Sequence, residues 1–69
     1  MPKTKAFSAR LKNLRAQAGL TQDELARRVG VRRLSVSQWE CGRRAPSLAT
    51  ARRIAQALGV SVDELAGVT

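Results

Sequence analysis

The part of the sequence that decides the fold is residues 21–42, which read TQDELARRVGVRRLSVSQWECG. Thr21 and Glu24 have the spacing of a capping box, in which the threonine side chain accepts from the glutamate amide and the glutamate side chain reaches back. A short apolar face then ends at Gly30, and a second one begins at Val31. Two short helices joined by a turn of a few residues that contains glycine are typical of a helix-turn-helix.

The apolar positions of this stretch are arranged for a close helix crossing. Such a crossing needs a small residue facing the partner helix, and Ala26 meets that need. The apolar positions that would line the crossing are Leu25, Val29, Val31, Val36 and Trp39. The spacing of Trp39 with Val36 points both side chains inward, so we expect Trp39 in the core and not stacked on a base.

The segments on either side also read as helices. An apolar stripe with helical period precedes the stretch, at Phe7, Leu11, Leu14 and Ala18. A second stripe, which we expect to face the core, follows Ser47 at Leu48, Ala51, Ile54, Ala55 and Leu58. Ser61 and Glu64 have capping-box spacing and open a short last helix. No segment alternates with a period of two, so no strand is expected. The sequence therefore predicts one compact, all-α, five-helix domain over residues 6–69, with the motif at about 21–42 and a loose basic N-terminus at Met1–Lys5.

The charge is strongly positive and unevenly placed. The 69 residues carry 13 Lys and Arg against 5 Asp and Glu, a net charge of +8. All of the cations lie in residues 1–53, whereas residues 54–69 carry two acids and no cation. A basic excess of this size indicates a polyanionic partner, nucleic acid before an anionic membrane surface.

Composition excludes most catalytic and metal chemistry. The chain has no His and one Cys, so it cannot assemble the usual zinc ligand sets or a Ser–His–Asp or Cys–His site. We expect no enzyme activity, no metal, no cofactor and no small-molecule ligand. With no signal peptide and no apolar run near the roughly 18 residues of a membrane span, we expect a soluble cytoplasmic protein that does not bind membranes.

Taken together, the motifs resemble the phage-repressor and Cro-like helix-turn-helix domains, the XRE family, over residues 8–66. The resemblance rests on Leu14-Arg15, Gly19–Gln22, Glu24–Ala26, Gly30-Val31, Val36-Ser37, Trp39-Glu40, Gly42, Pro46–Leu48, Ile54-Ala55, Ala57–Val60 and Asp63–Leu65. It implies a lambda-repressor-like five-helix domain that binds operator DNA as a dimer, with the third helix in the major groove.

The outward face of that third helix holds the candidates for reading bases. They are Arg33, Leu34, Ser37 and Gln38. Arg33 has the fork that matches guanine O6 and N7, and Gln38 has the amide that pairs with adenine. Leu34 is suited to a thymine methyl, although an exposed leucine needs no special explanation and Arg33 is nearly as well suited to a phosphate.

The candidates for phosphate contact lie at the ends of the two motif helices. They are Gln22, Arg32, Arg43 and Arg44. Gln22 opens a helix whose free amides favour an anion, and the resemblance implies that its side chain contacts phosphate as well. The resemblance also implies that the loop holding Arg43 and Arg44 grips the DNA backbone.

The resemblance further implies a structural ion pair between Arg15 and Glu40, and the sequence departs from the family at two positions. Arg32 stands where Ser or Thr usually caps the recognition helix, a loss of about 1 kcal/mol. Cys41 stands where Asn or Arg is common, and a thiol there is ordinarily a small hydrophobe.

We expect a small transcriptional regulator, a repressor or autoregulator, that binds a palindromic duplex as a homodimer. The dimer contact is expected in the C-terminal third, where residues 54–69 carry no cation, at Val60, Leu65 or Val68, although these residues could instead close the monomer core. The alternative function is a protein-interaction module of the same fold that lacks specific DNA binding, such as an antitoxin-type partner. The basic recognition face argues against this alternative.

Overall fold

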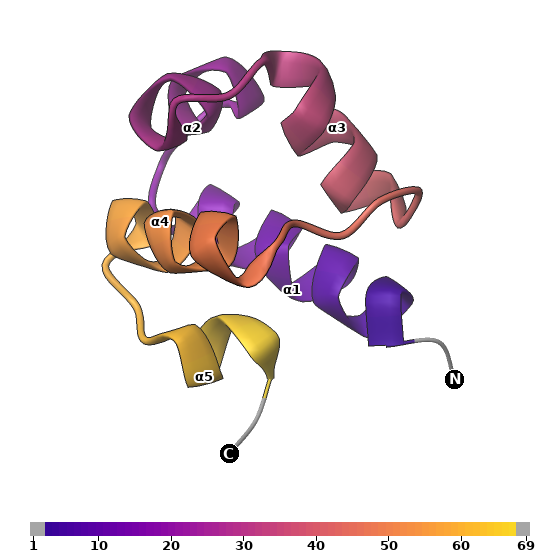
Figure 1. Cartoon of the computed structure of the whole chain (residues 1–69). Helices are drawn as coiled ribbons and strands as arrows, with labels where there is room; N and C mark the ends of the chain where they lie inside the picture. The colour runs from indigo at the N-terminus through magenta and orange to yellow at the C-terminus, as the bar shows by residue number, and fades with distance from the viewer. Residues whose placement is uncertain (1–2, 68–69) are drawn as a thin grey trace.

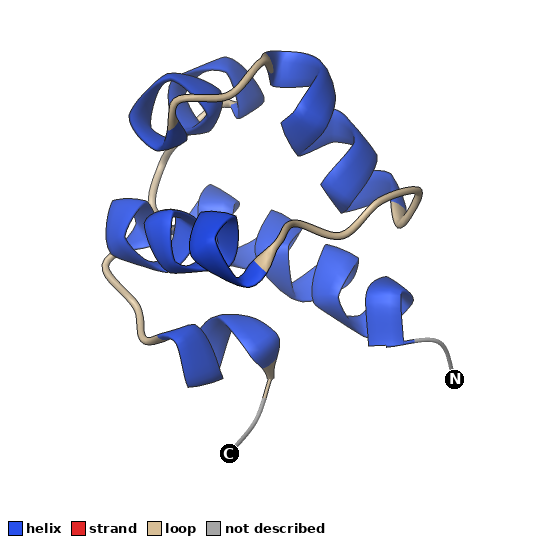
Figure 2. Ribbon diagram, in the orientation of Figure 1, coloured by secondary structure: helices blue, strands red, loops and turns tan. Residues whose placement is uncertain are grey.

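Five α-helices make up the part of the chain that this computed structural model describes, residues 3–67, with side chains from residue 6 (Figure 1). They are α1 (Lys3–Gln17), α2 (Gln22–Val29), α3 (Arg33–Cys41), α4 (Leu48–Leu58) and α5 (Val62–Ala66). Helices and loops account for all of the described residues, and no strand occurs among them (Figure 2). The all-α, five-helix prediction is confirmed.

Two helices form the middle of the domain and the other three cover them. In Figure 1, α1 and α4 lie across the centre, α2 and α3 lie above them, and α5 lies below. α1 packs against α3 and α5, and α4 packs against α2 and α5. The helix-turn-helix pair therefore lies at one end of the domain, where α1 and α4 support it.

The helix ends follow the capping residues that the sequence marks. Both halves of the Thr21 capping box are present: the Glu24 amide donates to Thr21 Oγ1 at 3.1 Å, and the Thr21 amide donates to Glu24 Oε1 at 2.8 Å. Hydrogen bonding from the Thr21 backbone and side chain lowers the pKa of Glu24. Ser47 and Ser61 cap α4 and α5, accepting from the amides three residues on. Because each cap is a bond between residues three positions apart, the starts of α2, α4 and α5 can be located from the local sequence.

The core joins all five helices. Its buried residues are Leu11, Leu20, Leu25, Ala26, Val29, Val36, Trp39, Ile54, Ala55 and Leu65. Trp39 is among them, as predicted, at 6% exposure. A stacking role for this ring is therefore excluded in the folded domain.

The N-terminal prediction is wrong in one respect. Lys3–Lys5 were expected in a loose N-terminus, but α1 begins at Lys3. Lysine and the alanine at position 6 are good helix formers, so the helix extends beyond the apolar stripe that marks its buried face. Met1 and Pro2 lie outside the described residues.

Candidate nucleic-acid interface

The turn between α2 and α3 depends on Gly30. This residue adopts a left-handed conformation with φ of 84°, which costs side-chain-bearing residues energy that glycine avoids. The Gly30 and Val31 amides both donate to the Ala26 carbonyl, at 2.8 and 3.0 Å. α2 therefore ends sharply at Val29, and α3 begins at Arg33 after three intervening residues.

α3 turns one face to the core and the other to solvent. Val36 is fully buried on the inner side, whereas Leu34 is 59% exposed. The four predicted base-contacting residues occupy this helix: Arg33 and Leu34 are exposed, and Ser37 and Gln38 are half-buried. The structure thus brings them together along one side of α3, in the arrangement that the helical period implies.

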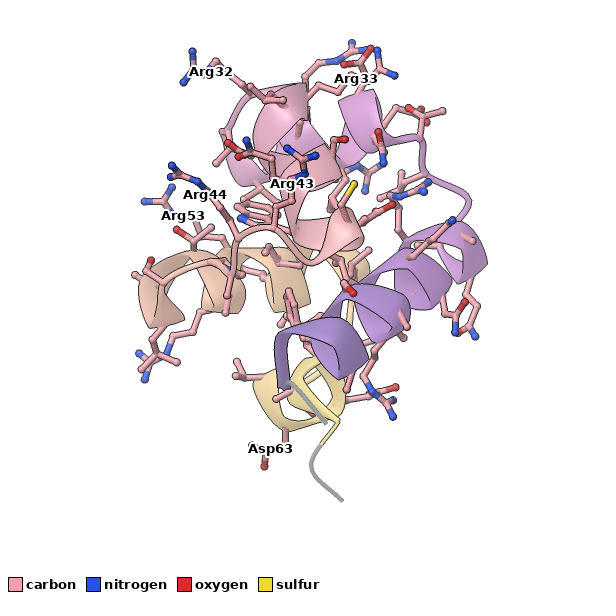
Figure 3. All side chains as sticks on the ribbon, turned by 90° about the vertical axis from the view of Figure 1, so that its right-hand side faces the viewer. Arg32, Arg33, Arg43, Arg44, Arg53 and Asp63 are labelled. Carbon is pink, nitrogen blue, oxygen red and sulfur yellow. The ribbon has the colours of Figure 1, made fainter. Side chains whose placement is uncertain are left out.

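Cations flank this helix at both ends (Figure 3). Arg32 and Arg33 lie at its beginning, and Arg43 and Arg44 follow its end; all four are exposed. In Figure 3 the four side chains lie in the upper half of the molecule, and Asp63 lies at the opposite end. The charge asymmetry of the sequence is therefore also an asymmetry in space.

The backbone at each end of α3 is well defined. Arg32 is the N-cap residue and makes no side-chain capping bond, as its identity predicts. At the other end, the Arg43 and Arg44 amides donate to the Gln38 carbonyl at 3.0 and 3.4 Å. This return of the chain holds the two arginines beside the last turn of α3.

An ion pair joins α1 to α3. Arg15 donates from Nε and Nη2 to the two carboxylate oxygens of Glu40, at 2.5 and 3.0 Å. The side chains are 15% and 4% exposed. Arg15 also donates from Nη1 to the Leu20 carbonyl at 2.7 Å. The hydrogen bond to Glu40 raises the pKa of Arg15, and the expected pair is present as a structural tie between two helices and the loop that follows α1.

A third helix is attached to the same carboxylate. Gln22, the first residue of α2, donates from Nε2 to Glu40 Oε1 at 3.1 Å. Sequence reasoning treated Gln22 as a phosphate ligand only and missed this contact. No local pattern signals it, because the partners lie 18 positions apart on different helices.

The C-terminal residues expected at a dimer contact are placed differently. Leu65 is 1% exposed and belongs to the core, so its prediction as an interface residue is wrong. α5 is short and its one buried residue is needed to close the core beneath α1 and α4. Val60 is partly buried against the core, and Val68 lies outside the described residues.

The exposed apolar surface of this half of the domain lies at the start of α4. Leu48 is 63% exposed, although the periodicity of α4 places it on the apolar stripe. It borders a cavity of about 230 Å³. The cavity is lined by Phe7, Ala45, Pro46, Leu48, Ala51, Val62, Leu65 and Ala66, none of them charged.

Two further features bear on the class of protein. Cys41 ends α3 and its thiol is exposed. No helix within residues 3–67 combines the length and the apolar character needed to cross a membrane.

A helix-turn-helix family model, HTH_3, matches residues 11–65, which include all of α2, α3 and α4. The chain belongs to this helix-turn-helix family. An uncharacterized HTH-type transcriptional regulator of Methanothermobacter thermautotrophicus is 58% identical over 45 residues, which are 65% of this chain and 65% of that protein. The HTH-type transcriptional activator BcrR of Enterococcus faecalis is 36% identical over 59 residues, 86% of this chain but 29% of that protein. The chain thus spans less than two thirds of either relative.

Solved structures share the fold. The restriction-modification controller protein C.AhdI of Aeromonas hydrophila superposes with a TM-score of 0.87 at 37% identity, covering 90% of this chain and 94% of that one. Hydroxypropylphosphonic acid epoxidase of S. wedmorenis also contains the fold, with a TM-score of 0.83 at 32% identity, but the match covers only 33% of that chain. The family fold therefore occurs both as nearly a whole regulator and as a part of a larger enzyme.

Proposed function

We propose that this chain is a sequence-specific DNA-binding transcriptional regulator that reads the major groove with α3. The observation that carries the proposal is the exposed side of α3, with four side chains suited to base edges and two exposed arginines beyond its C-terminal end. A helix of this kind presents its N-terminal part to the bases in helix-turn-helix domains. The regulator relatives named above support the same reading.

Each base-contacting candidate has a distinct task in this proposal. Arg33 donates two bonds to a guanine, and Gln38 pairs with an adenine through its amide. Leu34 packs on a thymine methyl, and Ser37 supplies an adaptable hydroxyl. Together these side chains define the sequence preference.

The backbone contacts set the register of the helix in the groove. Arg32 lies where α3 begins, and Arg43 and Arg44 lie where it ends, so the three guanidinium groups reach phosphates on either side of the groove. Gln22 and the free amides at the start of α2 bind a further phosphate. These contacts carry affinity and little sequence information.

The wider functional proposal is a cytoplasmic repressor or autoregulator that acts on a palindromic operator, with no enzymatic reaction and no cofactor. An interaction module that binds only protein has no use for a basic recognition face, so the four exposed arginines favour DNA. Selection of sites from random duplex DNA, followed by a footprint, tests this directly. Recovery of one enriched motif that the protein protects supports the regulator, and recovery of no motif contradicts it.

We propose that two copies bind together through the face around Leu48. One recognition helix covers too few base pairs to select a genomic site, and paired half-sites about 34 Å apart solve that problem. No residue that lines the cavity beside Leu48 is charged, so no charge is buried when two copies meet there. A two-fold interface uses the same patch on both copies, so in this proposal the exposed Leu48 of each copy packs into the cavity of the other.

Leu48→Asp is expected to weaken operator binding by about 10², because the two half-sites then bind independently. The monomer fold should be retained, since Leu48 is exposed. Gln56→Asp, which adds the same charge at an exposed position of the same helix, is the matched control. Analytical ultracentrifugation with a palindromic duplex measures the stoichiometry. If two Leu48→Asp chains bind one palindromic duplex as tightly as two wild-type chains do, the face around Leu48 is not the dimer interface.

A further inference from the structure

The Glu40 carboxylate lies where three helices meet, and it accepts three N–H groups. Two come from Arg15 on α1 and one comes from Gln22 on α2, while Glu40 itself belongs to α3. Oε1 is shared between Arg15 Nη2 at 3.0 Å and Gln22 Nε2 at 3.1 Å. Because the side chain is only 4% exposed, water has little access to compete for these bonds.

This arrangement dictates which way the Gln22 amide faces. An ionised carboxylate only accepts, so the nitrogen end of the amide must face Glu40. One N–H of that nitrogen is committed to Glu40, which leaves the second N–H as a donor for another acceptor. An amide without this tie can rotate and present its carbonyl oxygen instead, which a phosphate oxygen repels.

We propose that Glu40 is a positioning residue for DNA binding, whose carboxylate holds the Gln22 amide with an N–H ready for a phosphate. The inference rests on the proposed function, because it assigns a role within the same interface. Glu40 does not touch the DNA in this proposal. It acts through Gln22, and Arg15 neutralises the charge that would otherwise oppose a nearby phosphate.

The hydrogen bond between Gln22 and Glu40 also connects the proposed phosphate contact on α2 to α3, the helix proposed to read bases. Gln22 opens α2 and Glu40 lies near the end of α3, so a phosphate held at Gln22 fixes the position of α3 as well. Gln22 and Arg33 also line one surface pocket of about 410 Å³ with Arg15, Thr21 and Asp23. The positioned amide therefore lies beside a base-reading candidate.

Charge alone predicts the opposite effect, which makes the proposal testable. Glu40→Gln removes a negative charge from the DNA-facing half of the domain, so simple electrostatics makes binding tighter. The positioning role makes binding weaker, by about tenfold, the value of one hydrogen bond to a charged group. Gln22→Ala should weaken binding by a similar factor without changing the salt dependence, because glutamine releases no counterion.

The experiment is a double-mutant cycle in DNA affinity, with the folded fraction of each variant measured by circular dichroism. It uses the wild type, Glu40→Gln, Gln22→Ala and the double variant, with Gln56→Ala as a control at an exposed glutamine on α4. We expect Glu40→Gln to cause no further loss once Gln22 is alanine. Equal losses from Glu40→Gln in both backgrounds, or tighter binding by the single variant, would overturn the role. A wild type that binds no duplex would refute the proposed function itself.

The wild-type chain provides a second readout if Glu40→Gln does not fold. NMR of the Gln22 side-chain NH₂ group should show one proton protected from exchange in the free protein. The other proton should shift when a half-site duplex is added. Two equally exposed protons in the free protein, or an NH₂ group that does not respond to duplex, would overturn the proposal.

Discussion

The affinity of this chain for its duplex is expected to fall by about 10³–10⁵ between 50 and 200 mM salt. The physical reason is counterion release from DNA by the cations that reach phosphates. The exposed arginines that flank α3 are Arg32, Arg33, Arg43 and Arg44. If three or all four of these neutralise phosphates in both copies of a dimer, roughly 6–8 counterions are released. Fluorescence anisotropy at five salt concentrations measures the slope.

A matched pair of variants locates the cations responsible. Arg43→Gln is expected to reduce the slope of log affinity against log salt by about 1 for each subunit. Arg10→Gln is the control, because the Arg10 guanidinium lies against Gly67 at the end of α5, the helix farthest from α2 and α3 in Figure 1. Equal slopes for wild type and Arg43→Gln, or an affinity that is constant over this range, would remove the α3 face from the interface.

Arg15→Met is expected to lower the free energy of unfolding by about 3–5 kcal/mol. The substitution leaves Glu40 with a side chain that is 4% exposed and no cation to neutralise it. Because small domains are stable by only about 5–15 kcal/mol, this loss is a large fraction of the total and leaves the variant much closer to unfolding. Urea denaturation followed by circular dichroism measures the change.

The second half of this test restores the balance of charge. Glu40→Gln in the Arg15→Met background should recover part of the lost stability, because removing both charges leaves no unpaired ion in the protein. Arg27→Met, at an exposed position of α2, should change stability little. Strictly additive effects of Arg15→Met and Glu40→Gln would show that the ion pair contributes no coupling energy.

Much of the fold is predictable because its signals are local. The Thr21 box, the Gly30 turn and the serine caps each act within four residues, so a reader of the sequence can place them without tertiary information. The inward direction of Val36 and Trp39 follows from the helical period alone. The same period correctly turns Leu34 to solvent.

The errors occur where burial depends on neighbouring helices. Leu48 fits the apolar stripe of α4 but is 63% exposed, whereas Leu65, expected at an interface, is 1% exposed. The helical period indicates which side of a helix a residue occupies. It does not indicate whether another helix covers that side along the whole length of the helix. Here α5 closes over the core with Leu65 and leaves the first turn of α4 uncovered.

In the candidate site too, contacts set by local spacing are predictable from the sequence, whereas a contact set by the packing of helices is not. The outward set on α3 follows from spacing, and the Arg15–Glu40 pair follows from the family resemblance. The Gln22–Glu40 bond follows from neither, because it depends on how the start of α2 approaches α3. The Glu24 bond to Thr21 was visible in the sequence because both ends belong to one helical turn.

Base reading by α3 is tested by the ratio of two affinities measured at one salt concentration. One duplex carries the site selected from random DNA, and the other has the same length and composition in scrambled order. The wild type is expected to bind the selected site at least about 10³ times more tightly than the scrambled duplex. Gln38→Ala is expected to weaken binding to the selected site by roughly 5- to 150-fold, because one base contact is lost, and to relax the preference at that base pair. Its affinity for the scrambled duplex should not change. Equal affinities of the wild type for the two duplexes would show that α3 does not read bases.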